Sequence, residues 1–199
     1  MPFSSESGKN YIRNLVSTIK HDKILDIGCG SGTYAKMFPD SDLTGIEVWG
    51  PYISQYGLSD LYDKLIVEDA REWIPDDQYD LAIAGDVLEH MTVDEAVELL
   101  NKLKQCAKNV LISIPIGHYP QDEYEGNPYE RHIKDDWSDD EVRQYFGKPT
   151  YSMIDNEIGV YMYSSEKKKL KIAVYGISKN EEKFAERFCK AAKIGRAHV

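Results

Sequence analysis

The chain has 199 residues, of which 42% are hydrophobic and 29% are charged, and its formal net charge is −10. A chain of this length buries a substantial core and holds one complete domain. No apolar stretch approaches the roughly 20 residues that cross a bilayer, and the first residues lack a basic and apolar signal sequence. We therefore expect a cytoplasmic protein without membrane insertion.

The charge is unevenly distributed along the chain. Residues 1–165 contain 14 Lys and Arg against 30 Asp and Glu, whereas residues 166–199 contain 10 against 4. An acidic domain repels phosphates, so a nucleic-acid partner is not expected. The change of sign near residue 165 predicts a domain boundary.

The three cysteines are Cys29, Cys106 and Cys189. They are odd in number and lie at neither metal-site nor disulfide spacings. This pattern predicts reduced thiols and no metal site.

Hydrophobic periodicity predicts helices and strands that alternate along the chain. Apolar residues recur at helical spacing over residues 8–19, and residues 24–27 form a short apolar stretch typical of a buried parallel strand. Further strands are predicted at residues 42–47, 64–67, 79–85 and 109–114.

Two later helices are predicted from capping boxes, at residues 94–106 after Thr92 and at residues 138–146 from Ser138. Residues 150–164 then predict a hairpin. The elements together predict an α/β fold with a doubly wound, Rossmann-like sheet of seven strands, mostly parallel with an antiparallel C-terminal pair.

A turn with three glycines at alternate positions follows the first strand. Gly28, Gly30 and Gly32 can adopt positive φ and let the backbone touch a ligand, and a helix expected from Thr33 offers unpaired N–H groups. The spacing GxGxG differs from the GxGxxG of dinucleotide sites. Asp26, two residues before the first glycine, suits an ammonium or sulfonium better than a phosphate. The turn therefore predicts a nucleotide-like cofactor other than NAD.

The sequence DIGCGSGTY at residues 26–34 resembles the first motif of class I S-adenosylmethionine-dependent methyltransferases, and later motifs extend the resemblance over about residues 1–165. The resemblance implies an enzyme whose cofactor is S-adenosyl-L-methionine. The expected cofactor-binding residues are Asp26, Gly28, Cys29, Gly30, Gly32, Thr33, Glu47, Val48, Asp69, Ala70, Gly85 and Asp86.

Two of these residues are acids that follow strands. Glu47 ends the second strand, beside the glycine turn in a doubly wound sheet, where a carboxylate accepts hydrogen bonds from both ribose hydroxyls. By the resemblance, Asp69 would accept the adenine amino group. The alternatives are a solvated strand-end carboxylate and an ordinary loop aspartate.

The segment of residues 79–91 resembles the fourth-strand motif of the methyltransferases that act on small molecules. The resemblance implies that Gly85 and Asp86 lie under the methionine end of the cofactor, with Glu89 or His90 where the acceptor arrives. Histidine titrates near neutral pH, so His90 is a candidate base for a hydroxyl acceptor, oriented by an acidic partner. The alternative is that Glu89 and His90 only cap the helix and pack against the loop.

A long polar loop at residues 115–137 is rich in aromatic residues, and loops of this length usually have a function. Its sequence GNPYERHI resembles a segment in a bacterial and phage subgroup of the family, where this loop covers the substrate. Aromatic faces stack on sugar rings, and guanidinium groups hold carboxylate or phosphate. The alternative is a self-packed lid. The candidate substrate-binding residues are His118, Tyr119, Tyr129, Arg131 and His132.

The C-terminal segment differs in character. Residues 169–188, which include KNEE, resemble the opening strand and helix of family 2 glycosyltransferases. We expect residues 166–193 to be a linker and the truncated start of such a domain, in a fusion that acts on a glycan. The alternative is an extra strand and helix appended to the first domain. Residues 194–199 can be encoded by a common sequencing-library adapter, so a non-native tail on a metagenomic fragment is expected.

Three functions follow from this reading. The favoured function is methyl transfer from S-adenosylmethionine to a small-molecule or sugar-containing acceptor. A NAD-binding oxidoreductase is disfavoured by the glycine spacing, by Asp26 and by the antiparallel strand pair. A third option is a catalytically inactive cofactor-binding module.

Overall fold

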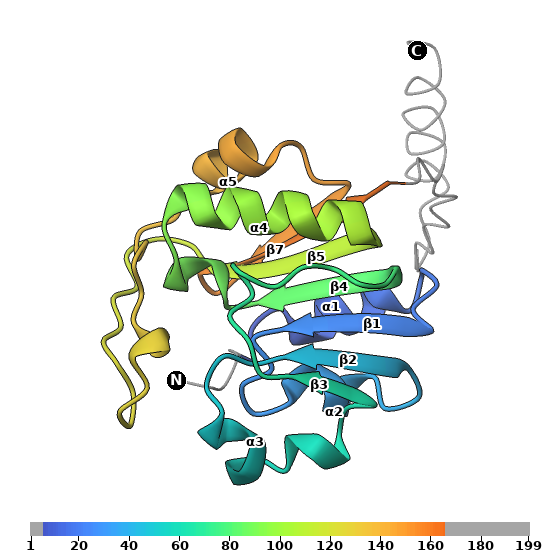
Figure 1. Ribbon diagram of the computed structural model, residues 1–199. Coiled ribbons are helices and arrows are strands. Elements are labelled where there is room, and N and C mark those ends of the chain that lie inside the picture. Colours follow the sequence, from blue (N-terminus) through green and yellow to red (C-terminus); the bar gives the residue numbers. More distant parts are fainter. Residues whose placement is uncertain (1–5, 166–199) are drawn as a thin grey trace, which may run out of the picture. The chain divides into compact units, whose positions relative to one another are not determined.

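The computed structural model describes residues 6–165, which form an α/β fold around one seven-stranded sheet (Figure 1). The strands are β1 (Lys23–Ile27), β2 (Asp42–Ile46), β3 (Lys64–Ile66), β4 (Tyr79–Gly85), β5 (Ala107–Pro115), β6 (Tyr151–Asp155) and β7 (Ile158–Ser164). Their order is β3-β2-β1-β4-β5-β7-β6. The pairs from β3 to β5 are parallel, whereas β7 pairs antiparallel with both β5 and β6. The predicted fold class is confirmed.

Helices cover both faces of this sheet (Figure 1). They are α1 (Lys9–Val16), α2 (Thr33–Met37), α3 (Pro51–Gln55), α4 (Val93–Cys106) and α5 (Asp139–Phe146), with the short 3-10 helices η1 (Leu58–Asp60), η2 (Leu88–His90) and η3 (Pro128–Glu130). In β4, Ala82 and Ala84 belong to the core with α4 and α5, whereas Leu81 and Ile83 belong to the core with α1 and α2. A parallel strand between two helical layers is apolar on both faces, and this explains the run that predicted β4.

Two elements, α1 and β5, differ from their predicted bounds by two residues or more. The chain leaves α1 at Val16 and continues in turns to residue 19. Strand β5 begins at Ala107, directly after α4, and includes Pro115. Pro115 is the last residue of the strand, paired with Ile158, where a missing N–H is tolerated.

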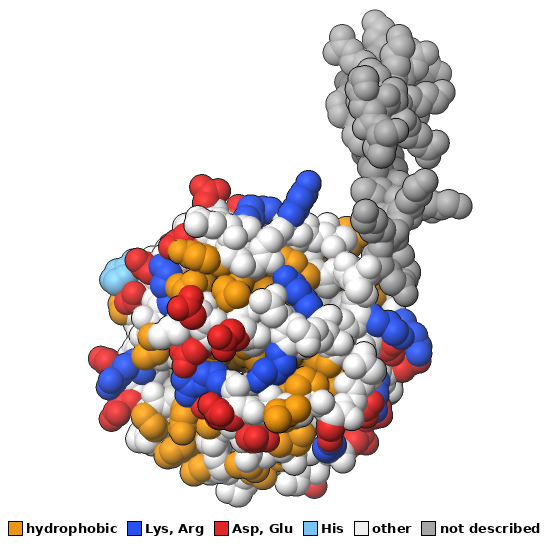
Figure 2. Space-filling model, turned by 45° about the horizontal axis from the view of Figure 1, so that its top comes forward, with side chains coloured by type: hydrophobic (Ala, Val, Ile, Leu, Met, Phe, Trp, Pro, Cys, Tyr) orange, Lys and Arg blue, Asp and Glu red, His pale blue; other side chains and the backbone are white. Residues whose placement is uncertain are grey.

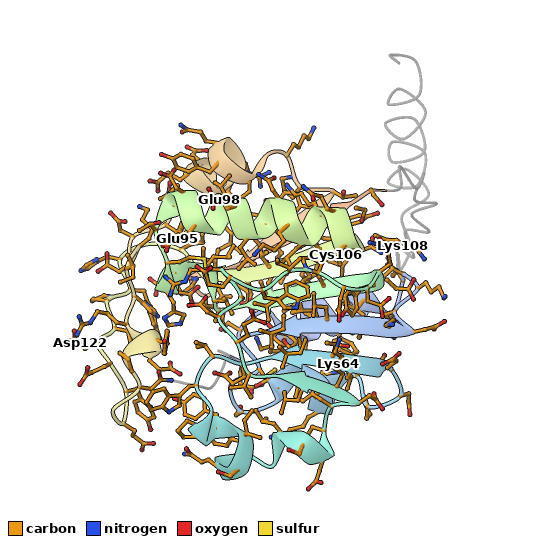
Figure 3. All side chains as sticks on the ribbon, viewed as in Figure 1. Lys64, Glu95, Glu98, Cys106, Lys108 and Asp122 are labelled. Atoms are coloured by element: carbon orange, nitrogen blue, oxygen red, sulfur yellow. The ribbon has the colours of Figure 1, made fainter. Side chains whose placement is uncertain are left out.

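Both predicted capping boxes are present. Thr92 N–H donates to Glu95 Oε2 at 2.8 Å, and Thr92 Oγ1 accepts from Glu95 N–H at 3.4 Å. Ser138 and Glu141 make the same reciprocal pair at the start of α5. A cap of this kind stabilises a helix by about 1 kcal/mol. Side chains project from both sides of α4, and Glu98 lies on its outer side (Figure 3).

The interpretations of residues 166–193 as glycosyltransferase-like and of residues 194–199 as a non-native tail lie outside the described residues. Among residues 6–165, no helix combines the length and the apolar character that crossing a membrane requires.

Candidate active site

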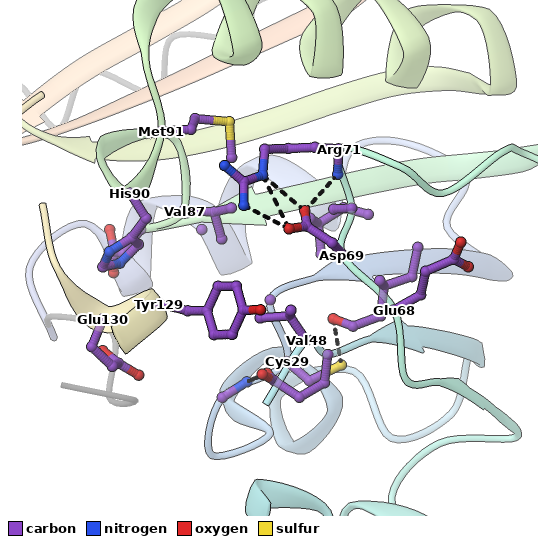
Figure 4. Close-up of a pocket in the computed structure, with 18 of the residues that line it drawn as sticks. Cys29, Val48, Glu68, Asp69, Arg71, Val87, His90, Met91, Tyr129 and Glu130 are labelled. Atoms are coloured by element: carbon purple, nitrogen blue, oxygen red, sulfur yellow. Dashed lines mark hydrogen bonds and ion pairs between the residues drawn. The ribbon is translucent and has the colours of Figure 1, made fainter. Parts of the chain in front are cut away.

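A cleft lies at the carboxyl ends of the parallel strands, around the junction between β1 and β4. Its walls enclose about 880 Å³, including space open to solvent. Ligands of open α/β sheets bind at this position because the chain leaves the two neighbouring strands in opposite directions. The walls come from the ends of β1, β2 and β4, the turn after β3, η2 and the segment around η3 (Figure 4).

The glycine turn after β1 forms one wall of the cleft. Gly28 and Gly30 have φ of 69° and 50°, a region that favours glycine. The N–H groups of Gly28 and Cys29 donate to the Ile46 carbonyl at 2.9 and 3.2 Å, which holds the turn against the end of β2. The predicted residues of this turn that line the cleft are Gly28, Cys29, Gly30 and Thr33.

Two predicted cofactor residues, Gly32 and Asp26, do not line the cleft. Gly32 precedes α2 with φ of 75°, and a Cβ there would lie 2.6 Å from the Leu61 side chain. Asp26 is fully buried: its Oδ2 accepts from the Tyr62 hydroxyl at 2.5 Å, and its Oδ1 has no hydrogen-bond partner within residues 6–165. The structure therefore places Asp26 behind the turn and not against a ligand.

Replacing Asp26 with Asn should flatten the pH dependence of stability. Burial raises the pKa of Asp26 to about 7 in the folded protein, from an ordinary value of 3.8. The folded carboxyl keeps a proton that the unfolded one has lost, so this group lowers the free energy of unfolding as pH rises from about 4 to about 7, by up to about 4 kcal/mol. Urea unfolding of both proteins at pH 5 and pH 8 measures the difference. An unchanged pH dependence in Asp26→Asn would contradict this assignment.

Glu47, directly after β2, lies against the glycine turn. Its Oε2 accepts from the Gly30 N–H at 2.9 Å, and its Oε1 accepts from the Trp49 N–H at 2.8 Å. Burial raises the pKa of Glu47, and these N–H groups partly oppose that rise. The residue lines the cleft, and each carboxylate oxygen has a second lone pair for a ligand hydroxyl.

Asp69 lines the cleft as half of an ion pair. The Arg71 guanidinium donates to both of its carboxylate oxygens, with a shortest distance of 2.6 Å, and the Arg71 main-chain N–H donates to Oδ1 at 2.9 Å (Figure 4). Arg71 also bonds Glu95 at 3.0 Å. The Arg71 contacts lower the pKa of Asp69, so the carboxylate is charged and held in place. Val48 and Ala70, two further predicted cofactor residues, also line the cleft.

Gly85 and Asp86, at the end of β4, also line the cleft. Asp86 has φ of 58° and accepts a hydrogen bond from the Ser113 hydroxyl at 2.9 Å. Lys9 of α1 is buried, lies 3.8 Å from Asp86 Oδ2 and donates to the Tyr34 hydroxyl at 2.9 Å. The Tyr34 and Ser113 hydroxyls lie 3.2 Å apart. This buried network fixes Asp86 from behind.

Replacing Gly85 with Ala should destabilise the fold by about 1–3 kcal/mol, because overpacking a buried site forces its neighbours apart. A Cβ at Gly85 would lie 2.2 Å from the Tyr34 hydroxyl oxygen, and Tyr34 is held by the buried network. Gly50→Ala is the matched control, since its nearest neighbour atom would be 3.8 Å away. Thermal unfolding of the two variants measures the effect. Equal melting temperatures would show that the space around Gly85 is not restrictive.

The two candidate catalytic residues lie in η2. His90 lines the cleft, and its Nδ1 contacts the main-chain carbonyl of Arg131 at 3.2 Å. Burial and the neighbouring His132 lower the pKa of His90 to about 4, so the ring is neutral near pH 7. Glu89 is buried beside the cleft and is not in its wall; burial raises its pKa well above the ordinary value. The group that orients His90 is therefore a carbonyl and not the expected acid.

The loop predicted to carry substrate-binding residues folds back on itself. Main-chain N–H groups of Gly117 and Tyr119 donate to the carbonyls of Trp137 and Asp135 at 2.7 and 2.6 Å. The two halves of the loop therefore pair along its base, and the chain between them carries η3 to the cleft.

Of the five candidate substrate-binding residues, only Tyr129 lines the cleft. Its ring lies between His90 and Val48 (Figure 4), and 6.4 Å from the Trp49 ring. The others lie on the part of the loop outside the cleft wall: His118, Tyr119, Arg131 and His132.

The cleft also contains residues that the sequence analysis did not identify. Glu130 in η3 is buried and accepts a hydrogen bond from the Tyr52 hydroxyl at 2.9 Å. Asn127 and Tyr34 also line the cleft. Glu130 is one of several acids in its loop, and Tyr34 lies in a helix. The local sequence therefore does not indicate that either residue lines the cleft.

Comparisons with known proteins agree with the fold and the glycine turn. Residues 24–109 match the family model of a methyltransferase domain. The structure of an S-adenosylmethionine-dependent methyltransferase from Clostridium acetobutylicum is similar, with a TM-score of 0.61 and 14% identity over 77% of this chain and 88% of that one. No curated protein sequence matches the chain.

Two further structures share the fold. A putative O-methyltransferase from Nostoc punctiforme has a TM-score of 0.57 and 20% identity, over 77% of this chain and 54% of that one. Magnesium protoporphyrin IX methyltransferase from Synechocystis, with bound SAH, has a TM-score of 0.58 and 12% identity, over 77% and 80%. None of the comparisons supports the glycosyltransferase-like interpretation of residues 166–193.

The sheet order is that of the class I methyltransferase fold, and residues 24–109, which include the glycine turn, match a methyltransferase domain.

Proposed function

We propose that the cleft binds S-adenosylmethionine with its ribose at Glu47, its adenine near Asp69 and its methionine end near Gly85 and Asp86. The Glu47 carboxylate supports this placement, because two main-chain N–H groups fix it at the cleft wall with lone pairs to spare. The glycine turn supports it too, since Gly28 and Gly30 expose backbone on which a ligand can lie.

We propose that the acceptor is a small or sugar-containing molecule. The observation that carries this is the position of Tyr129 and Glu130, which reach from η3 into the same cleft as Glu47 and His90. An aromatic face and a carboxylate are groups that recognise a hydroxylated ring. His118, Tyr119, Arg131 and His132 have no place in the cleft wall, so Tyr129 is the predicted substrate-binding residue that the proposal keeps.

Methyl transfer in this cleft depends on alignment. The reaction is an in-line displacement in which the sulfonium charge disappears. Holding the attacking atom in line with the methyl carbon and the sulfur therefore contributes more to the rate than strong electrostatic stabilisation. A hydroxyl acceptor also has to lose its proton. His90, neutral and in the cleft wall, is the group placed to take it.

A nucleic-acid substrate is disfavoured by the surface charge. On the face shown in Figure 2, Lys and Arg side chains are interspersed with Asp and Glu and form no continuous basic surface. Residues 1–165 hold about twice as many acidic as basic residues. A nucleic-acid site needs a basic stripe to meet the phosphates.

A methyl-transfer screen tests the acceptor class. The protein would be incubated with S-adenosylmethionine and mixtures of saccharides, small phenols or oligonucleotides, and the products analysed by mass spectrometry. We expect methylated products in the saccharide or phenol mixtures. Methylation confined to oligonucleotides would contradict the proposal, and cofactor binding without any methylated product would favour an inactive module.

A further inference from the structure

Three potential metal ligands lie close together at the edge of the cleft. They are Glu89, His90 and His132, which we call the Glu89 triad. One carboxylate oxygen of Glu89 and one ring nitrogen of each histidine lie within 4.8 Å of one another. Glu89 and His90 come from η2, whereas His132 comes from the loop after η3. The cysteine spacings predict no metal site, and ligands as far apart in the chain as His90 and His132 form no sequence motif.

The Glu89 carboxylate is buried without its full set of partners. The residue is 2% exposed, and its Oε2 has no hydrogen-bond partner within residues 6–165. A buried carboxylate oxygen left unpaired is costly. A cation bound at this oxygen removes that cost.

Each histidine of the triad has one ring nitrogen without a hydrogen bond to any of residues 6–165. Nδ1 of His90 contacts the Arg131 carbonyl at 3.2 Å, and Nδ1 of His132 contacts the Tyr119 carbonyl at 2.6 Å. Because a carbonyl only accepts, each Nδ1 carries the proton and each Nε2 keeps its lone pair. Metal-binding histidines donate their other N–H to a carbonyl in this way.

Main-chain hydrogen bonds hold the loop part of the triad against η2. The N–H groups of Ile133 and Lys134 both donate to the Glu89 carbonyl, at 2.8 and 3.1 Å. The His90 and His132 rings lie edge to face with their centroids 4.8 Å apart. The backbone therefore brings the three side chains together.

We propose that the Glu89 triad binds one divalent first-row transition-metal ion, such as Zn²⁺, through the Glu89 carboxylate and Nε2 of both histidines. Two imidazoles and one carboxylate are a ligand set of catalytic zinc sites, and they leave a position open for a substrate. Ligand atoms around a tetrahedral zinc ion are about 3.4 Å apart, so the triad closes on the ion by small side-chain rotations.

The inference rests on the proposed function and makes its acceptor more specific, namely a hydroxyl group whose oxygen binds the ion. A metal-bound hydroxyl releases its proton to water more readily than a free one. The oxygen then forms the new bond to the methyl carbon as the sulfur–methyl bond breaks, and that bond's electron pair stays on sulfur as a neutral thioether. In the metal-bound form His90 is a ligand and not the base, because Nε2 cannot hold both a proton and the ion.

Titration of the untagged, chelator-treated full chain with Co²⁺ tests this site, because Co²⁺ reports its coordination through visible d–d absorption. We expect saturation at one ion per chain, with the absorption of a four- or five-coordinate ion, and displacement by Zn²⁺. A titration without a saturable absorption band would overturn the proposal.

Two variants and a control locate the ion. His132→Gln removes a half-buried ligand from the loop and should weaken Co²⁺ binding by about 100-fold or more. Glu89→Gln should have the same effect if thermal unfolding shows that it is folded. His21→Gln, on the turn before β1 with its Nδ1 on the Ile19 carbonyl, is the control that should bind like the original protein. Unchanged binding by His132→Gln would overturn the proposal.

Calorimetry with S-adenosylhomocysteine on the same samples separates this inference from the proposed function. His132 lies outside the cleft wall, so His132→Gln should bind this ligand as the original protein does. Absence of Co²⁺ binding with ligand binding intact rejects the metal site alone. Absence of ligand binding by the original protein would contradict the proposed function and the catalytic role of the ion, even where Co²⁺ binds.

Discussion

Replacing Glu47 with Gln is expected to weaken S-adenosylhomocysteine binding by about 100-fold or more, since each hydrogen bond to a charged group contributes about 1.5–3 kcal/mol. The carboxylate accepts from the Gly30 and Trp49 N–H groups and has lone pairs left for both ribose hydroxyls. An amide offers one oxygen and places an NH₂ against one of those N–H donors. Isothermal titration calorimetry measures the change in affinity.

Glu98→Gln is the matched control for this substitution. Glu98 is exposed on the outer side of α4 (Figure 3), so the same chemical change there should leave affinity and melting temperature unchanged. Thermal unfolding of Glu47→Gln shows whether the glycine turn survives. Affinity retained within about threefold in a folded Glu47→Gln protein would contradict the ribose role of Glu47.

Replacing His90 with Gln is expected to lower kcat by about 100-fold or more while leaving S-adenosylhomocysteine affinity within about threefold. His90 lines the cleft from η2, whereas Glu47 and the glycine turn line it from the ends of β2 and β1, where the proposal places the cofactor. The expectation holds whether His90 takes the acceptor proton itself or binds an ion that assists its release. Single-turnover methylation of an acceptor found in the screen measures the rate.

His21→Gln is the control for the His90 substitution, because His21 precedes β1 and lies away from the cleft. It should keep full turnover. A His90→Gln protein with normal kcat would show that the ring only packs against the loop, and one that loses S-adenosylhomocysteine binding would place His90 in the cofactor site.

The sequence predicts most of the fold because its signals are local. The run that forms β4 is apolar on both faces, so its bounds at Tyr79 and Gly85 are predicted residue for residue. The Thr92 and Ser138 caps depend on residues three positions apart in the chain. The predicted bounds are wrong where the adjoining element determines them. Strand β5 starts at Ala107, two residues before the predicted start, because it follows directly after the last residue of α4.

The wall of the candidate site is predicted best where strand ends and the turns after them form it. The glycine turn and Glu47 follow from strand ends that any doubly wound sheet brings together. Sequence order gives no direction for a side chain, so it could not show that Asp26 is held by Tyr62 behind the turn. Nor could it bring His132 to Glu89, which requires the main-chain bonds between the loop and η2.

Calorimetric titration of the full chain with S-adenosylhomocysteine and, separately, with NADH tests the central claim most directly. An acid after the second strand occurs in the sites of both cofactor classes, and their glycine spacings, GxGxG and GxGxxG, differ by one residue. A binding measurement therefore distinguishes the two classes most directly. We predict saturable binding of S-adenosylhomocysteine and no heat from NADH. Binding of NADH with no binding of S-adenosylhomocysteine would contradict the account.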